Sequence, residues 1–73
     1  MANMREVNNA IREAFPALDI VAVRGNGYIY FDGDDGFDKI NSVYSHPLGT
    51  STPVMTRLCI NEIRDYIDKM VRN

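Results

Sequence analysis

The segment formed by residues 24–31 constrains the fold of this chain more than any other. Gly25-Asn26-Gly27 precedes a run in which tyrosine alternates with isoleucine and phenylalanine. Glycine adopts the positive φ angles that short hairpin loops require, and an alternating pattern is typical of a strand with one buried face. The segment therefore predicts a β-hairpin with its turn at these glycines.

Two registers are compatible with this hairpin. A three-residue loop with Gly27 as the left-handed residue pairs Arg24 with Tyr28, and a two-residue turn at Asn26 and Gly27 places Arg24 beside Ile29 instead. We expect the first register because it buries no charge. On the core face it places Val21, Val23, Ile29 and Phe31, and on the opposite face Arg24, Tyr28 and Tyr30.

Helical patterns occur at both ends of the chain. Apolar residues recur at helical spacing over residues 3–15, where Asn3 and Glu6 resemble a capping box and Pro16 marks the end. A second helix is expected over residues 53–71.

The second helix and a third strand have their own boundary signals. Ser51 or Thr52 before Pro53 provides a hydroxyl cap and a proline in the first turn. Residues 40–45 predict a weaker strand, in which Val43 faces the core and Tyr44 the opposite side.

These elements predict an α+β fold with the order α-β-β-β-α, in a single domain over residues 1–73. Both helices are expected on one face of a three-stranded antiparallel sheet. The other face remains open and is expected to carry Arg24, Tyr28, Tyr30 and Tyr44.

Composition limits what such a domain can do. A chain of 73 residues buries only about 60% of its extended surface, so its stability margin is small. Cys59 is the only cysteine and His46 the only histidine, which favours a reducing, cytoplasmic setting and argues against a metal site or a cofactor. The apolar run at residues 20–23 is too short to span a membrane. The net charge of −2 gives nucleic acid no general attraction.

Three groups of residues are candidates for chemistry. Residues 24–31 resemble the octapeptide of the RNA-recognition motif, except that Asn26 replaces an aromatic residue. The resemblance implies base stacking by Tyr28 and phosphate contact by Arg24. However, that family begins and ends with a strand, whereas this chain begins and ends in helix.

The acidic loop is the second candidate. Asp34 and Asp35 lie between two further aspartates, Asp32 and Asp38. The spacing does not fit a calcium-binding EF-hand loop, so a solvated turn or a contact surface for a basic partner is expected.

The third candidate is a catalytic centre at Cys59 or His46. Cys59 falls on the apolar side of the last helix, and a single histidine without an orienting partner does not define a triad. We therefore expect no enzymatic activity.

The hairpin together with the opening segment, residues 4–12, resembles small uncharacterised proteins of bacteriophages and prophages. This resemblance covers the first half of the chain and implies a protein that binds a host protein. The expected function is a small protein-interaction module with an unidentified protein partner, and the alternative is single-stranded nucleic-acid binding through Arg24, Tyr28 and Tyr30.

The last helix also predicts a homodimer. Its apolar residues span an arc of roughly 220°, wider than one sheet face requires. The surplus consists of Ile60, Ile67 and Val71. Packing against the first helix would absorb this edge, and an antiparallel pairing of two last helices would use it as an interface.

Overall fold

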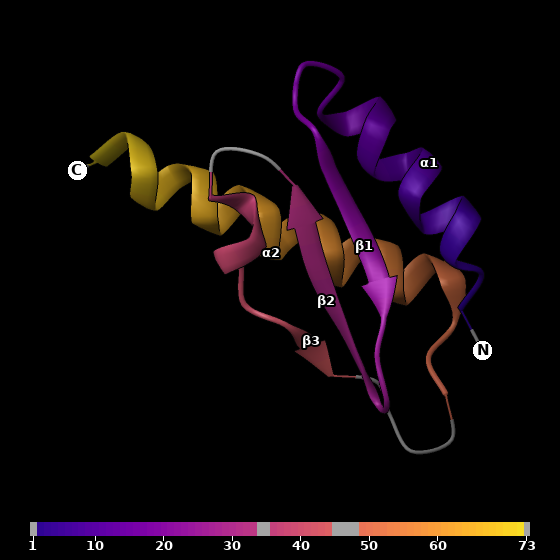
Figure 1. The fold of residues 1–73 in the computed structure, drawn as a ribbon. Coiled ribbons are helices and arrows are strands. Elements are labelled where there is room, and N and C mark those ends of the chain that lie inside the picture. The colour runs from indigo at the N-terminus through magenta and orange to yellow at the C-terminus, as the bar shows by residue number, and fades with distance from the viewer. Residues whose placement is uncertain (1, 34–35, 45–48, 73) are drawn as a thin grey trace.

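The computed structural model describes residues 2–33, 36–44 and 49–72 and confirms the predicted α+β fold. Its elements are α1 (Met4–Ala14), β1 (Ile20–Arg24), β2 (Tyr28–Gly33), the 3-10 helix η1 (Phe37–Lys39), β3 (Val43–Tyr44) and α2 (Thr52–Arg72). The strands form one antiparallel sheet in the order β1-β2-β3. In Figure 1, α2 crosses behind the sheet and α1 lies next to β1.

The hydrophobic core lies between this sheet and the two helices. Phe31 is the largest fully buried side chain of the sheet, and Val7 and Ile11 of α1 are completely enclosed. In α2 the fully buried side chains recur every four residues, at Met55, Cys59 and Ile63. All belong to one cluster, so both helices cover the same face of the sheet.

The boundaries of α1 follow the sequence signals. The Asn3 side chain accepts hydrogen bonds from the backbone N–H groups of Arg5 and Glu6, as an N-cap residue does. At the other end the Phe15 N–H donates to the Ile11 carbonyl, directly before Pro16. The predicted start and end of this helix are confirmed.

The expected hairpin register is wrong. Arg24 lies opposite Ile29 and Ala22 opposite Phe31, so the turn is the two-residue one at Asn26 and Gly27. The Gly25 N–H donates to the Tyr28 carbonyl at 2.8 Å, and Gly27 has a φ of 82°. The inner face of the hairpin therefore carries Ile20, Ala22, Ile29 and Phe31, while Val21 and Val23 lie on the outer face.

Arg24 remains exposed in this register because it stands at the end of β1. Its guanidinium donates to the backbone carbonyl of Ala2. A long basic side chain at a strand end can lie along apolar surface while its charged group stays in water. The observed register therefore buries no charge either, and the avoidance of buried charge does not distinguish the two registers.

The segment after β2 also differs from its prediction. Phe37, the first residue of η1, and Ile40, directly after it, are both buried, where a polar turn and the start of a strand were expected. The strand predicted over residues 40–45 is β3, which has two residues, Val43 and Tyr44. Side chains three residues apart in a 3-10 helix lie on one side, which directs both into the core. The expected orientation of Val43 and Tyr44, inward and outward respectively, is confirmed.

The Asn8 side chain of α1 hydrogen-bonds to the free edge of β1, the edge that does not pair with β2. Its side-chain amide donates to the Ala22 carbonyl at 3.0 Å, and its side-chain oxygen accepts the Ala22 N–H at 2.7 Å. An unpaired strand edge invites association with other chains, and here one side chain replaces a neighbouring strand at that point. The small side chain of Ala22, which is 3% exposed, packs in the core beneath this contact.

We predict that Asn8→Ala lowers the free energy of unfolding by about 1–3 kcal/mol, because it leaves two partly buried backbone groups without partners. Asn9→Ala is the matched control, since it makes the same change at the next, exposed position of α1. Urea denaturation of both variants measures the difference. Equal stability of the two would contradict a structural role for Asn8.

Candidate functional site

The outer face of the sheet carries a group of apolar and aromatic side chains that neither helix covers. We call it the tyrosine face; its members are Val21, Val23, Tyr28, Tyr30 and Tyr44. Tyr44 is 79% exposed, Tyr30 41% and Tyr28 36%, and Val21 is 40% exposed. The structure thus brings three of the four tyrosines together, as the sequence predicted, and adds two valines that the sequence placed in the core.

The tyrosines are held by the strand pairing. Tyr28 of β2 lies directly opposite Tyr44 of β3, and the rings of Tyr28 and Tyr30 are 6.1 Å apart between centroids, tilted by 44°. This spacing is within the range of favourable aromatic pairs. The pairing therefore gives the tyrosine face a defined arrangement of rings.

Gly25, directly after β1, supports the Tyr28 ring. A Cβ atom at Gly25 would lie 2.5 Å from the ring carbon Cζ of Tyr28, so the ring lies directly against the glycine backbone. Aromatic side chains often cover a glycine opposite them in a sheet, which compensates for the missing side chain. This contact explains why glycine is useful at position 25, although of the two glycines only Gly27 has a left-handed φ.

Arg24 does not belong to the tyrosine face, which corrects the expectation. The observed register places it on the inner side of β1, opposite Ile29. Its guanidinium binds the Ala2 carbonyl next to the start of α1. The resemblance to the RNA-recognition motif required Arg24 and Tyr28 to act together, and the two side chains lie on opposite sides of the sheet.

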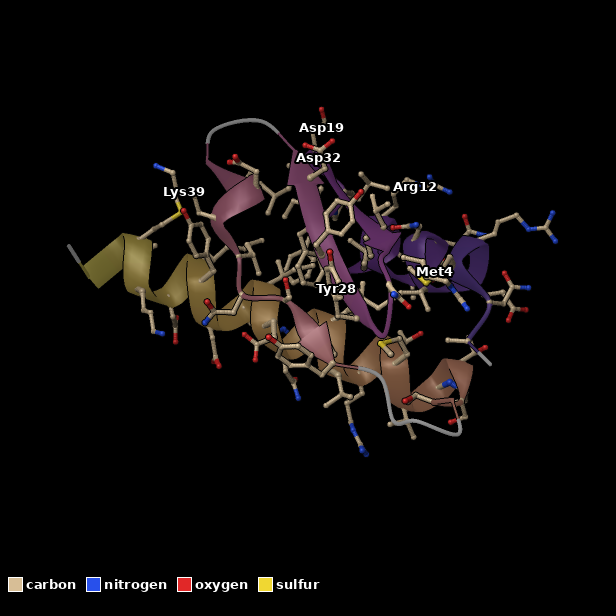
Figure 2. The ribbon with its side chains drawn as sticks, turned by 60° about the horizontal axis from the view of Figure 1, so that its bottom comes forward. Met4, Arg12, Asp19, Tyr28, Asp32 and Lys39 are labelled. Carbon is tan, nitrogen blue, oxygen red and sulfur yellow. The ribbon has the colours of Figure 1, made fainter. Side chains whose placement is uncertain are left out.

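The end of the hairpin away from the turn is acidic. Asp32 lies on the outer face opposite Val21, and Figure 2 shows Asp19 beside it. Both are exposed, and the Asp32 carboxylate also accepts the Gly33 N–H at 2.9 Å. The candidate residues Asp34 and Asp35 lie outside the described residues. Within residues 2–33, 36–44 and 49–72, no group of three acidic, histidine or cysteine side chains is placed to hold a metal ion.

Cys59 lacks the properties of a nucleophile. Its side chain is completely buried in α2, and burial raises the pKa of the thiol from 9.0 to about 11. The thiol therefore stays protonated near neutral pH, whereas a reactive cysteine has a lowered pKa and access to solvent. His46 lies outside the described residues.

The predicted dimer residues divide into two groups. Ile60 and Ile67 are partly buried and pack against the core, as the intramolecular alternative expected. Val71, in the last turn of α2, is 80% exposed, and the neighbouring Met70 is 46% exposed. Figure 1 shows this turn extending past the sheet at the C-terminal end.

The turn of the hairpin contains a signal to which the sequence-based prediction gave too little weight. Asn-Gly is the favoured pair for a two-residue hairpin turn, and giving it more weight would have put Val21 and Val23 on the outer face. None of the described helices is both long and apolar enough to cross a bilayer. Comparison of the chain with models of protein families, with curated proteins and with solved structures finds no match.

We predict that the Hα protons of Gly25 resonate clearly upfield of their usual position, because they lie under the Tyr28 ring. A proton NMR spectrum measures this shift. Tyr28→Ser should return the Gly25 signal to its usual position, and Tyr44→Ser should leave it in place. A Gly25 signal with no upfield shift in the wild-type protein would contradict the described contact.

Proposed function

We propose that this protein is a non-enzymatic interaction module that binds another protein through the tyrosine face. The observation that supports the proposal is the contrast between the two sides of the sheet. One side is fully packed by α1 and α2, while the other exposes three tyrosines and Val21. Contiguous exposed apolar surface on a small domain commonly marks an interaction site.

Tyrosine is suited to this role for physical reasons. Its ring buries a large area on binding, and its hydroxyl can still form a hydrogen bond with a partner. It is also one of the residues that contribute most often to binding energy at protein interfaces. Because Tyr28 is already fixed by Gly25 and Tyr30, binding loses less side-chain entropy there.

Single-stranded nucleic-acid binding is the less supported alternative. That function combines aromatic stacking with cationic contacts to phosphates. Tyr28 and Tyr30 could stack on bases, but Arg24 lies on the other side of the sheet and binds Ala2. The described positions of the outer face contain no basic residue.

The resemblance of the first half of the chain to bacteriophage and prophage proteins supports a bacterial host protein as the partner. A single unpaired cysteine fits a reducing compartment, so we place the interaction in the cytoplasm. We propose that the protein acts by occupying its partner rather than by catalysis.

We predict that Val21→Ser and Tyr44→Ser each weaken partner binding at least about tenfold, since interface anchors cost more than about 1.4 kcal/mol when truncated. Tyr44→Ser should change the free energy of unfolding by less than about 0.5 kcal/mol, because Tyr44 is 79% exposed. Quantitative affinity capture from a bacterial lysate, with wild-type and variant proteins as bait, measures the binding. Thermal denaturation measures the stability.

Val54→Ser is the matched control for Val21→Ser. Val54 of α2 is 38% exposed and Val21 is 40% exposed, so the two changes remove nearly equal apolar surface from different places. We expect wild type and Val54→Ser to retain a host protein that both Val21→Ser and Tyr44→Ser lose. Retention of every captured protein by Val21→Ser and Tyr44→Ser would refute the proposal.

We also propose self-association through the end of α2. Val71→Glu is predicted to convert a homodimer to a monomer without loss of stability, because Val71 is 80% exposed. Val54→Glu, at the other end of the helix, should leave the dimer intact. Ile67→Glu should instead unfold the chain, since Ile67 packs against the core. Analytical ultracentrifugation distinguishes these results, and a wild-type monomer at high concentration would exclude the dimer.

A further inference from the structure

We infer that the segment bound by the tyrosine face is basic: it presents apolar or aromatic side chains to the tyrosines and a lysine or arginine to Asp19 and Asp32. This inference rests on the proposed function and specifies the chemistry of the partner. It follows from the distribution of charge over the fold and from the position of the two aspartates beside the tyrosines.

Charge is unevenly divided along the chain. The chain between the two helices, residues 15–51, contains five aspartates and only two basic residues, Arg24 and Lys39. The helices contain the other six basic residues and five acidic ones. The segment between the helices therefore carries a net charge of −3, although the whole chain has a net charge of only −2.

Asp19 and Asp32 bring part of this negative charge onto the tyrosine face. Asp32 belongs to the same side of β2 as Tyr28 and Tyr30, and the Asp19 backbone lies against that of Gly33, next to Asp32. In the described part of the chain no ion pair joins either carboxylate to a basic side chain. Both carboxylates remain exposed, so they can attract a cation from a partner (Figure 2).

The spacing along β2 defines the partner segment further. Asp32 is four residues from Tyr28, which corresponds to about 13 Å along a strand. A partner in extended conformation would span this distance with about four residues, and a helical one with about nine. The basic residue of the partner should therefore lie about 13 Å from the apolar residue that contacts Tyr28.

The same charge distribution disfavours two other occupants. A second copy of the chain would bring the Asp19 and Asp32 carboxylates toward another acidic face, where like charges repel. Nucleic acid would bring phosphates to that face with no described basic side chain to neutralise them. A basic protein segment can cover the exposed apolar surface and also pair with the negative charge of the two aspartates.

Selection from a library of random linear peptides tests this inference. The wild-type protein should enrich peptides that combine Lys or Arg with aromatic or aliphatic residues. The Asp19→Asn/Asp32→Asn double variant should bind such a peptide about fivefold or more weakly at low salt, since each exposed ion pair contributes modestly. The side-chain amide introduced at position 32 would keep an oxygen that can accept the Gly33 N–H, so the hairpin end should stay intact.

The matched control is Asp65→Asn/Asp68→Asn, which makes the same change of net charge at two exposed positions of α2. Its affinity should change less than about twofold, because these positions lie away from the tyrosine face. Affinity of the wild type should fall as salt rises, and that of the Asp19/Asp32 variant should fall less. Fluorescence anisotropy with a labelled peptide from the selection measures the affinity of all three proteins for that peptide.

The outcomes separate the inference from the proposed function. Peptides that need Tyr28 and Tyr30 but show no excess of basic residues, or that bind the Asp19/Asp32 variant equally well, would overturn the basic partner and leave the interaction face in place. No enriched peptide, or enrichment that Tyr28→Ser and Tyr30→Ser do not affect, would overturn both. Binding of single-stranded DNA to the tyrosine face, or its burial by a second copy, would likewise refute a basic protein partner.

Discussion

The two-residue turn at Asn26 and Gly27 determines on which side of the sheet each side chain of the hairpin lies. Side chains alternate along a strand, so a shift of one residue in pairing exchanges the two faces of β1. The observed pairing of Ala22 with Phe31 sends small Ala22 toward the helices and exposes Val21. Both the core and the tyrosine face are consequences of this register.

The same register makes the docking of α1 possible. Because Ala22 is small and points inward, α1 can approach β1 closely enough for Asn8 to bind both backbone groups of that residue. The start of α1 is tied to the rest of the fold as well: the Asn3 N–H donates to the Thr52 hydroxyl at 2.9 Å, and Arg24 binds the Ala2 carbonyl. Hydrogen bonds between residues distant in the sequence therefore hold the helices on one side of the sheet, in addition to apolar burial.

The side of the sheet that the helices do not cover exposes Tyr28, Tyr30 and Tyr44. Burial raises the pKa of the Cys59 thiol. On the exposed face, the Tyr28 ring lies against Gly25 and beside the Tyr30 ring. Such a surface suits the protein contact that we propose. In this proposal the acidic residues at the end of the hairpin favour a positively charged partner, because an exposed carboxylate discriminates between partners mainly through charge.

The sequence alone determined the order of the elements, the Asn3 cap of α1, the alternation of tyrosine with core residues in β2 and the inward orientation of Val43. These features depend on short-range preferences: helical and strand periodicity, capping and turn chemistry. The tertiary structure decided the position of Arg24, the exposure of Val21 and Val23, the inward packing of Phe37 and Ile40, and the attachment of Ile60 and Ile67 to the core. The inward packing of Phe37 and Ile40 and the attachment of the α2 residues depend on which segments distant in the chain come into contact, and local patterns do not specify this. In the hairpin the Asn-Gly pair does favour the observed turn, but the apolar residues of β1 fit either face, so a shift of a single residue exchanged the two faces.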